Sequence, residues 1–294
     1  MHEDSKKVVP CVLASLSAGA VSGALAKTTI APLDRTKINF QVSRTRRYSF
    51  KAALKFIRAT YQTEGFVALY RGNSATLARV IPYAAFQFAA HERFKYLLSV
   101  DHGEKTPVKR LLAGSLAGFV ATSLTYPLDT AKARLSISKK SEYSGFVDVI
   151  VKSYRTEGSL ALYRGIWPTL AGVIPYAGAS FYTFETLKLM YKEEFGSAPS
   201  APYLLIFGAT AGLIGQSCTY PLDIVRRRMQ TGRVPNGMGV LALLSHIARE
   251  EGIRSLYKGL SMNWLKGPIS VGVSFTTYHF TFPYLSTFSR TKSN

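Results

Sequence analysis

Cysteine and acidic residues are scarce in this sequence, and each shortage limits the classes of protein to which it can belong. Among 294 residues only Cys11 and Cys218 are cysteines, and they do not form the pattern of a disulfide framework. We expect both to be free, buried thiols. Asp and Glu number 17 against 37 Lys and Arg, which gives a formal net charge of +20. Such a charge would ordinarily indicate a nucleic-acid partner.

Patterns typical of enzymes are also missing. The five histidines are scattered, and we find no metal-ligand cluster or activated nucleophile. We therefore expect no enzyme, no bound metal and no cofactor. The first ten residues, MHEDSKKVVP, contain acids and no arginine, so they match neither a secretory signal nor an arginine-rich transit peptide. Any organelle address is expected to be internal.

Charged residues make up only 18% of the chain and apolar residues 47%, so long stretches lack charge. Six segments of roughly 18–23 residues hold at most one charged residue, and about 20 apolar residues span a bilayer as a helix. They are Val12–Leu33, Gly72–Ala90, Leu111–Leu128, Gly165–Phe184, Leu204–Leu222 and Gly267–Ser289. The pattern predicts an all-α membrane protein with six transmembrane helices.

The alternative is a soluble bundle of six buried helices. A soluble helix would show a polar face, whereas these segments offer Gly, Ala, Ser and Thr. GxxxG pairs begin at Gly19, Gly114 and Gly208, and such pairs let helix backbones approach closely in lipid. These pairs favour the membrane protein. The basic residues follow the apolar segments instead of gathering on one soluble face, which argues against nucleic acid.

Two motifs occur three times at one period. Pro-Leu-Asp begins at Pro32, Pro127 and Pro221, at separations of 95 and 94 residues. EGFVALYRG, EGSLALYRG and EGIRSLYKG follow in the same phase. A period near 94 residues is that of a small domain and not of a solenoid. We therefore expect three copies of one unit, over residues 8–100, 106–195 and 201–289.

Each repeat is expected to contain a long helix, a short amphipathic helix and a second long helix. The first long helix, Val8–Gln41, is expected to be interrupted and kinked at Pro32, because proline lacks an N–H donor. The short helices, expected along the inner membrane surface, are Phe50–Gln62, Phe146–Tyr154 and Gly239–Arg249. The other long helices are Gly72–Val100, Thr106–Ser136, Ile166–Phe195, Pro202–Gln230 and Ser261–Phe288.

Basic loops predict the orientation of the six spans. Eight Lys or Arg and no acid lie between Arg35 and Arg58, whereas Tyr191–Pro202 holds one Lys and two Glu. Because basic residues concentrate on the inner side of a membrane, we expect the loops within each repeat inside and both termini outside.

Acids and bases near the inner ends of the odd-numbered helices make a candidate gate. Each Pro-Leu-Asp aspartate is followed three residues later by a base. The residues are Asp34, Lys37, Asp129, Lys132, Asp223 and Arg226. Local i,i+3 pairing on solvated helix ends would contribute only ~0–1 kcal/mol. Three copies at corresponding depths instead favour a ring of ion pairs between repeats.

These motifs resemble the signature of the mitochondrial carrier family, and the resemblance covers nearly the whole chain. The family pattern is Pro-x-acid-x-x-base-x-base, then Gln two positions later, with Glu-Gly-x4-aromatic-base-Gly downstream. The resemblance implies six tilted helices with threefold pseudosymmetry around a water-filled cavity. It also implies a monomeric solute antiporter of the mitochondrial inner membrane, with short helices on the matrix side and both termini toward the intermembrane space.

The resemblance further implies a matrix gate built from the aspartates and bases just described. Its pairs would be Asp34 with Lys132, Asp129 with Arg226, and Asp223 with Lys37. Gln41 and Gln230 match the family's glutamine brace. In the second repeat the brace is replaced by Ser136, and in the first the second base is replaced by Asn39. We therefore expect an incompletely braced gate that opens easily.

A second, cytoplasmic gate is implied on the even-numbered helices, where the family pattern is aromatic-acid-x-x-base. Its charged residues are expected at Glu92, Lys95, Glu185 and Lys188. In the third repeat Tyr278 is followed by His279 and neither charge is present. We therefore expect a weak cytoplasmic gate.

Two bases inside apolar segments, Arg79 and Lys266, are candidate anion ligands. At the bilayer centre such residues cost ~2.5–3.5 kcal/mol on insertion scales, so they normally face water, a ligand or an acidic partner. With Gly172 they align with the family's three substrate contact points. The alternative is interhelical ion pairing. Because both align to one cavity, we expect them to bind phosphate.

An apolar slot lies at the second contact point, Gly172-Val173-Ile174. Glycine there leaves room for a flat ring, and the family associates this pattern with adenine. Further cations expected at the cavity or its inner end are Lys27, Arg35 and Arg227. A slot combined with several cations predicts a nucleotide that carries multiple phosphates.

Four stretches, APLDRTKI, RGNSATLARVIPYAAFQF, IFGATAGLIGQS and KGLSMNWLKGP, are similar to family members that carry coenzyme A. This resemblance implies import of coenzyme A in exchange for ADP or adenosine 3′,5′-diphosphate. Its pantetheine arm could lie near Tyr83 and Tyr176, which packing explains equally well. The alternatives are an ADP/ATP exchanger, whose RRRMMM is here RRRMQT, and an ATP-Mg/phosphate carrier, whose calcium-regulated form would have an EF-hand before the first span.

A glycine precedes each even-numbered helix, at Gly72, Gly165 and Gly259. Free amides at a helix start bind phosphate, and the resemblance implies cardiolipin head groups at these positions. A plain turn is the alternative explanation.

Overall fold

The computed structural model describes residues 2–45, 48–100, 107–139, 141–234 and 237–291. These residues form helices and no strands. The chain divides into two compact units. The first comprises Met1–Thr36, Ala53–Val151 and Leu265–Asn294, and the second comprises Lys37–Ala52 and Lys152–Trp264.

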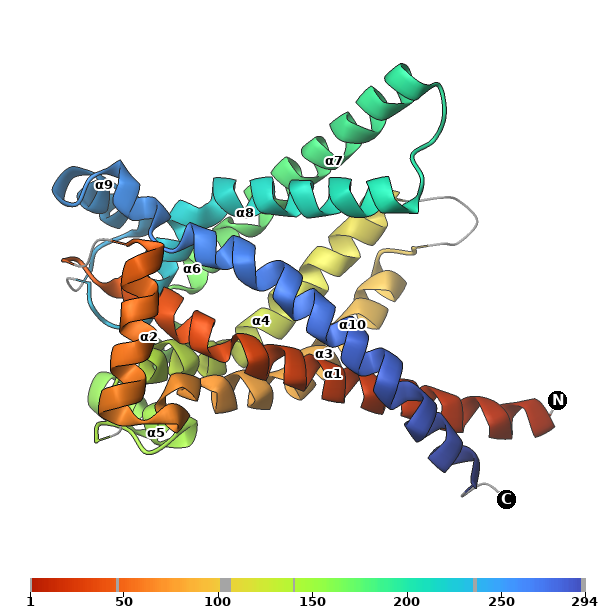
Figure 1. The fold of residues 1–294 in the computed structure, drawn as a ribbon, viewed down its shortest axis with the longest axis horizontal. Helices are drawn as coiled ribbons and strands as arrows, with labels where there is room; N and C mark the ends of the chain where they lie inside the picture. The colour runs from red at the N-terminus through yellow and green to blue at the C-terminus, as the bar shows by residue number, and fades with distance from the viewer. Residues whose placement is uncertain (1, 46–47, 101–106, 140, 235–236, 292–294) are drawn as a thin grey trace. The chain divides into compact units, whose positions relative to one another are not determined.

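The same order of helices occurs three times along the chain (Figure 1). The first repeat contains α1 (His2–Val42), α2 (Phe50–Glu64), the 3₁₀ helix η1 (Phe66–Tyr70) and α3 (Asn73–Leu97). The second contains α4 (Pro107–Ile137), α5 (Phe146–Glu157), η2 (Ser159–Tyr163), α6 (Ile166–Ala171) and α7 (Val173–Phe195). The third contains α8 (Ala201–Gln230), α9 (Val240–Glu250), η3 (Ile253–Tyr257) and α10 (Leu260–Thr291). The expected helices are present, and the 3₁₀ turns were not predicted.

Prolines act differently from the sequence prediction in two helices. α1 is helical through Pro32, so the expected interruption there is wrong. A proline removes only one hydrogen bond, and neighbouring turns keep the backbone helical. Conversely, the helix expected over Ile166–Phe195 is divided into α6 and α7 at Gly172. Pro175 has no N–H to donate to the carbonyl of Ala171, where α6 ends.

Within the part of the chain that the structure describes, two helices are long and apolar enough to cross a membrane by length and composition. They are Lys109–Ile137, within α4, and Ala201–Gln230, which is α8. The arrangement with six spans therefore stays a prediction at this level.

The short helix of the third repeat packs against the end of α8. Leu243 and Ile247, one turn apart on α9, are buried with Tyr220 and Ile224, one turn apart on α8, and with Leu256 of η3. Fully burying an apolar side chain of this size contributes ~1.5–3 kcal/mol. This contact holds the basic end of α8 in place within the second unit.

In the first unit the corresponding contact joins three helices. Val149 of α5 is buried with Ala131 and Leu135 of α4 and with Ala75 of α3. The two alanines lack long side chains, so the backbones of α3 and α4 can approach each other closely. The basic end of α4 is thereby held against its neighbours.

Close packing explains two of the glycines that precede the second long helix of a repeat, Gly72 before α3 and Gly259 before α10. Gly72 and Gly259 have φ of 93° and 86°, where a side chain is strained. A Cβ at Gly72 would also lie 2.9 Å from Ser136 Oγ and 3.1 Å from the Lys132 carbonyl oxygen. A Cβ at Gly259 would lie 3.1 Å from Tyr220 Oη. These contacts account for both glycines as tight turns, Gly72 against α4 and Gly259 against α8.

The expectation of buried thiols is wrong for Cys218, which is free and exposed. Leu213 and Ile214 of the same helix are also exposed, at 36% and 41%. An apolar span need not bury its outward residues against protein when lipid is their solvent. The side chain of Cys11 lies outside the described residues.

Candidate functional site

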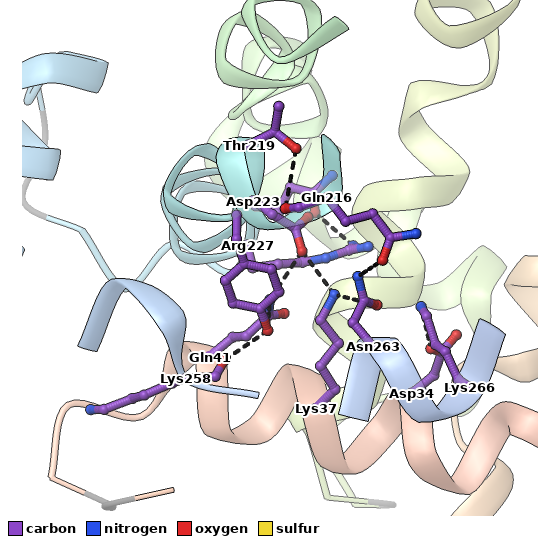
Figure 2. A network of polar contacts seen from close by, with 12 residues as sticks. Asp34, Lys37, Gln41, Gln216, Thr219, Asp223, Arg227, Lys258, Asn263 and Lys266 are labelled. Carbon is purple, nitrogen blue, oxygen red and sulfur yellow. Dashed lines mark hydrogen bonds and ion pairs between the residues drawn. The ribbon is translucent and has the colours of Figure 1, made fainter. Parts of the chain in front are cut away.

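Asp34 of α1 is held by two lysines from two other repeats. Its Oδ2 accepts a hydrogen bond from Lys132 Nζ of α4 at 2.8 Å. Its Oδ1 accepts one from Lys266 Nζ of α10 at 3.0 Å, as Figure 2 shows. The Asp34 and Lys132 side chains are each only 14% exposed. One carboxylate therefore links three helices of the first unit.

Asp223 of α8 is held by one lysine and one amide. Its Oδ2 accepts hydrogen bonds from Lys37 Nζ at 2.8 Å and from Gln41 Nε2 at 3.0 Å (Figure 2). The same Gln41 nitrogen lies 3.2 Å from Tyr220 Oη, which accepts from it. The pair expected between Asp223 and Lys37 is therefore present in the second unit, and Gln41 contacts it as a brace would.

Two amides extend this network beyond the residues chosen from the sequence. Lys37 Nζ also donates to Asn263 Oδ1 at 3.1 Å, and Asn263 Nδ2 donates to Gln216 Oε1 at 2.9 Å. Figure 2 shows this chain from α1 through α10 to α8. The signals that could have revealed it are an amide, Gln216, within the apolar segment Leu204–Leu222 and a second amide, Asn263, in the helix expected over Ser261–Phe288.

Asp129 of α4 is paired with Arg79 of α3. Arg79 Nη1 donates to Asp129 Oδ1 at 2.8 Å, and Arg79 Nε donates to Thr125 Oγ1 at 3.1 Å. The Arg79 guanidinium also lies over the Tyr83 ring, 4.8 Å from its centroid. Arg226, the base expected to pair with Asp129, belongs to the other unit, and that pair stays a prediction.

Both candidate anion ligands therefore contact a gate aspartate. Arg79 bonds Asp129 and Lys266 bonds Asp34. This is the interhelical pairing that the sequence left open as an alternative. Hydrogen bonds to charged groups are worth about 1.5–3 kcal/mol each, so an anion that takes over either of these bonded N–H groups competes with a carboxylate.

The remaining expected cations differ in their surroundings. Lys27 is exposed and has no ion-pair partner among the described residues. Arg227 Nη1 donates to Gln230 Oε1 at 3.0 Å. Arg35 is only 4% exposed, and its guanidinium bonds Glu64. Of these cations, Arg35 is the one enclosed by protein.

The expected slot for a flat ring belongs to the second unit. Val173 and Ile174 are exposed, at 48% and 79%. A Cβ at Gly172 would lie 3.3 Å from the Pro168 carbonyl oxygen and 3.9 Å from Leu222 Cδ1. Because residue 172 is a glycine, no side chain projects there, and the next two residues along the chain, Val173 and Ile174, are exposed aliphatic side chains.

Charged residues of the expected cytoplasmic gate pair within their own helices. Lys95 Nζ lies 3.6 Å from Glu92 Oε1 on α3, and Lys188 Nζ lies 3.1 Å from Glu185 Oε1 on α7. The two glutamates are 71% and 54% exposed. Exposed i,i+3 pairs contribute ~0–1 kcal/mol, so these contacts add little to any closure of that side.

Glu251, at the end of α9, binds the basic end of α8. Its Oε2 accepts hydrogen bonds from Arg228 Nη2 at 2.8 Å and Lys258 Nζ at 3.2 Å. Burial raises the pKa of Glu251, but hydrogen bonds and charge from Arg228 and Lys258 outweigh it and lower that pKa below its ordinary value. Arg228 Nε also donates to the Gln41 carbonyl at 3.1 Å. This cluster joins the ends of α1 and α8.

Comparison with known proteins adds to this geometry. The sequence model of the family described as "Mitochondrial carrier protein" matches residues 10–102, 103–195 and 197–288. The mitochondrial coenzyme A transporter of Xenopus tropicalis is 53% identical over 288 residues, covering 95% of this chain and 86% of that protein. That of Homo sapiens is 52% identical, covering 95% and 93%. Solute carrier family 25 member 16 of Mus musculus is 42% identical, covering 90% and 86%.

Proposed function

The chain belongs to the mitochondrial carrier family, and from that premise we propose that it imports coenzyme A into mitochondria in exchange for adenine nucleotides. The observation that carries the mechanism is the pairing of both candidate phosphate ligands with gate aspartates. Arg79 and Lys266 are the ligands, and Asp129 and Asp34 are their partners.

Competition for these two cations would couple substrate binding to gate opening. A phosphate that takes Lys266 leaves Asp34 with Lys132 alone, and a phosphate that takes Arg79 frees Asp129. The ligand can shift the equilibrium only by its differential affinity for the two states. Exchanging a carboxylate for a phosphate at each cation supplies such a difference, because it weakens the closed matrix gate while it binds the substrate.

Coenzyme A suits this charge pattern because it carries a diphosphate, a 3′-phosphate and an adenine. We assign the phosphates to Arg79 and Lys266, with Lys27 and Arg227 as further cations. The adenine is assigned to the slot at Gly172, where the exposed Val173 and Ile174 offer apolar contact. Relatives named as coenzyme A transporters, at 52–53% identity over most of the chain, support this substrate.

The membrane arrangement follows the same proposal. Six spans with the short helices α2, α5 and α9 on the matrix side would place both termini toward the intermembrane space. The basic loops within the repeats support this orientation. The free ends of α1 and α10 extend toward the same side in Figure 1. Exchange would proceed by alternating access around a central site, with one protomer as the transporting unit.

Cardiolipin is proposed as a lipid partner at the helix starts after Gly72, Gly165 and Gly259. The support is the anion preference of helix N-termini. The tight packing at Gly72 and Gly259 is an independent reason for glycine at those positions.

The test of substrate is uptake of labelled coenzyme A by liposomes that contain the purified protein. We expect saturable uptake that requires ADP or adenosine 3′,5′-diphosphate inside the liposomes. An ADP/ATP or ATP-Mg/phosphate carrier is the second candidate, and it predicts the opposite result. No coenzyme A uptake alongside brisk ADP/ATP exchange would overturn the proposal.

The test of the site is the pair of variants Arg79→Gln and Lys266→Gln. Each is expected to lower coenzyme A uptake at least about tenfold, because a charged hydrogen bond to phosphate is lost. Lys55→Gln, which removes one charge from the exposed surface of α2, is the matched control. Wild-type uptake by either site variant would remove that residue from the substrate site.

A further inference from the structure

The first repeat lacks an arginine that the other two repeats have. Five residues after the Pro-Leu-Asp aspartate, the second and third repeats carry Arg134 and Arg228, whereas the first carries Asn39. The first repeat instead has Arg35 one residue after its aspartate, where the others have no base. Residues 35 and 39 are four apart, so they lie one above the other on the same face of α1.

In the third repeat the arginine makes two kinds of contact. Both terminal nitrogens of Arg228 donate to the carboxylate of Glu251, from the Glu-Gly motif of the same repeat. Its Nε donates to the carbonyl of Gln41, in the next repeat, at 3.1 Å. Arg228 is 2% exposed. We call this arrangement, in which one arginine joins the Glu-Gly turn of its own repeat to the first long helix of the next repeat, the arginine clamp.

In the first repeat Arg35 makes the same two kinds of contact. Its Nη2 donates to Glu64, from the Glu-Gly motif of the same repeat, at 2.9 Å. Its Nε donates to the carbonyl of Ser136, in the next repeat, at 3.3 Å. Its Nη1 donates to the carbonyl of Ala68 in η1.

The correspondence holds position by position. Gln41 and Ser136 are each the seventh residue after the aspartate of their repeat, and Glu64 and Glu251 each begin a Glu-Gly motif. Because the acceptor in the next repeat is a main-chain carbonyl, the clamp does not depend on which side chain occupies that position.

We propose that Arg35 is the arginine clamp of the first repeat, displaced by one helical turn, and that it acts as a positioning residue and not as a substrate ligand. Every guanidinium nitrogen already donates a hydrogen bond, and the residue is 4% exposed. Its charge is therefore satisfied by protein. The contact to Glu64 stiffens the first repeat, while the contact to Ser136 holds the end of α4 in the closed matrix gate.

The inference deepens the proposed function, since gate closure matters only to a carrier, but its first readout needs no substrate. Arg35→Gln removes three hydrogen bonds of a guanidinium on a residue that is only 4% exposed, one of them to the Glu64 carboxylate, and hydrogen bonds to charged groups contribute more to stability than those between neutral groups. We expect the apparent melting temperature of the purified protein in detergent, without substrate, to fall by about 5–10 °C. Lys55→Arg, on the exposed surface of α2, is expected to leave it unchanged.

Rescue is the decisive measurement. Asn39→Arg, added to Arg35→Gln, places the arginine where the third repeat has it, and we expect it to restore most of the melting temperature and of the coenzyme A uptake. A substrate ligand could not be replaced in this way. Lost uptake with a wild-type melting temperature in Arg35→Gln, or a fully stable Arg35→Gln/Asn39→Arg protein that still fails to transport, would overturn the proposal.

A double-mutant cycle keeps the inference testable if the rescue variant does not fold. Arg35→Gln, Glu64→Gln and the double variant are compared by melting temperature alone. A clamp predicts that the double variant loses about as much as either single one, and additive losses contradict it. If no variant or wild-type protein carries coenzyme A, the proposed substrate fails while the melting temperatures still decide on the clamp.

Discussion

Asp34 and Asp223 occupy the same position in two repeats, yet they are held by different partners. Asp34 is shared between two ammonium groups, Lys132 and Lys266. Asp223 has one ammonium group, Lys37, together with the amide of Gln41. The comparison teaches that Asp34 is held by two direct ion pairs, whereas Asp223 is held by one direct ion pair and one amide, with the charges of Arg226 and Arg227 also acting on it.

The two centres should therefore respond differently to an anionic substrate. At Asp34 one of the two bases, Lys266, is also a proposed substrate ligand, so a phosphate competes directly with the carboxylate. At Asp223 neither Lys37 nor Gln41 belongs to the proposed substrate site. Under the proposed function, the substrate would therefore compete for a direct partner of Asp34, and it would not compete for Lys37 or Gln41 at Asp223.

The largest effects on stability and uptake are expected when each of the two aspartates is neutralised in turn. Asp34→Asn leaves Lys132 and Lys266 without the carboxylate that both bond directly, whereas Asp223→Asn breaks one direct ion pair, that of Lys37, beside the charges of Arg226 and Arg227. Removing one partner of a buried pair costs about 3–5 kcal/mol, so we expect a larger fall in melting temperature for Asp34→Asn. Uptake of coenzyme A should be lost in both variants.

The control for this pair is Glu194→Gln, which removes an exposed acid at the end of α7 and should change neither quantity. A greater loss of stability in Asp223→Asn than in Asp34→Asn would contradict the view that the two ion pairs of Asp34 stabilise the protein more than the contacts of Asp223 do.

The pH dependence of stability tests the ion pairs that Glu251 makes at the end of α8. The folded-state pKa of Glu251 lies below its ordinary value of 4.5. A depressed carboxyl pKa contributes stability that is present above the unfolded pKa and is lost as the pH falls through the folded one. We expect the melting temperature to decline over that range. In Glu251→Gln this part of the decline should disappear, and an unchanged pH profile would argue against the Arg228 and Lys258 contacts.

Removing the brace should have an intermediate effect. Gln41→Ser gives the first repeat the residue that the second has at this position, and it removes the hydrogen bonds to Asp223 and Tyr220. We expect a loss of about 1–2 kcal/mol, seen as a lower melting temperature. The matched change is Ser136→Ala, because Ser136 Oγ donates to the Lys132 carbonyl of its own helix. Equal losses in both variants would mean that Gln41 is not a brace.

The smallest effect is expected from the amide chain. Asn263→Ala removes the bonds to Lys37 and Gln216 and should cost about 1 kcal/mol. Thr76→Ala changes the equivalent position of the first repeat, where Thr76 Oγ1 donates only to the Gly72 carbonyl of its own turn. Thermal unfolding should separate the two, with Thr76→Ala close to wild type.

Much of the site follows from repetition in the sequence. The spacing of Pro-Leu-Asp predicts ion pairs between repeats at equivalent depths, and the family resemblance indicated which residues would pair. The pairs of Asp34 with Lys132 and of Asp223 with Lys37 are present. Such predictions succeed because a helix converts fixed sequence spacing into fixed height and direction.

Other contacts could not be predicted from the same spacing. Arg35 was expected at the cavity or its inner end from alignment with the family, yet its guanidinium reaches Glu64, which no helical period relates to it. Asn263 was not selected, because an amide in an expected helix does not indicate which residue it will bond. These contacts depend on how α1, α2, α8 and α10 approach one another through side chains of different lengths.

The amino-acid sequence alone determined the threefold repeat, the helices and the chemistry of the charged positions, because these depend on local spacing and residue type. Only the tertiary structure decided which charges meet. It gave Arg79 to Asp129, Lys266 to Asp34 and Arg35 to Glu64. The physical reason is that a largely buried charge takes the partner that packing brings within hydrogen-bond distance, and packing is a property of the whole fold.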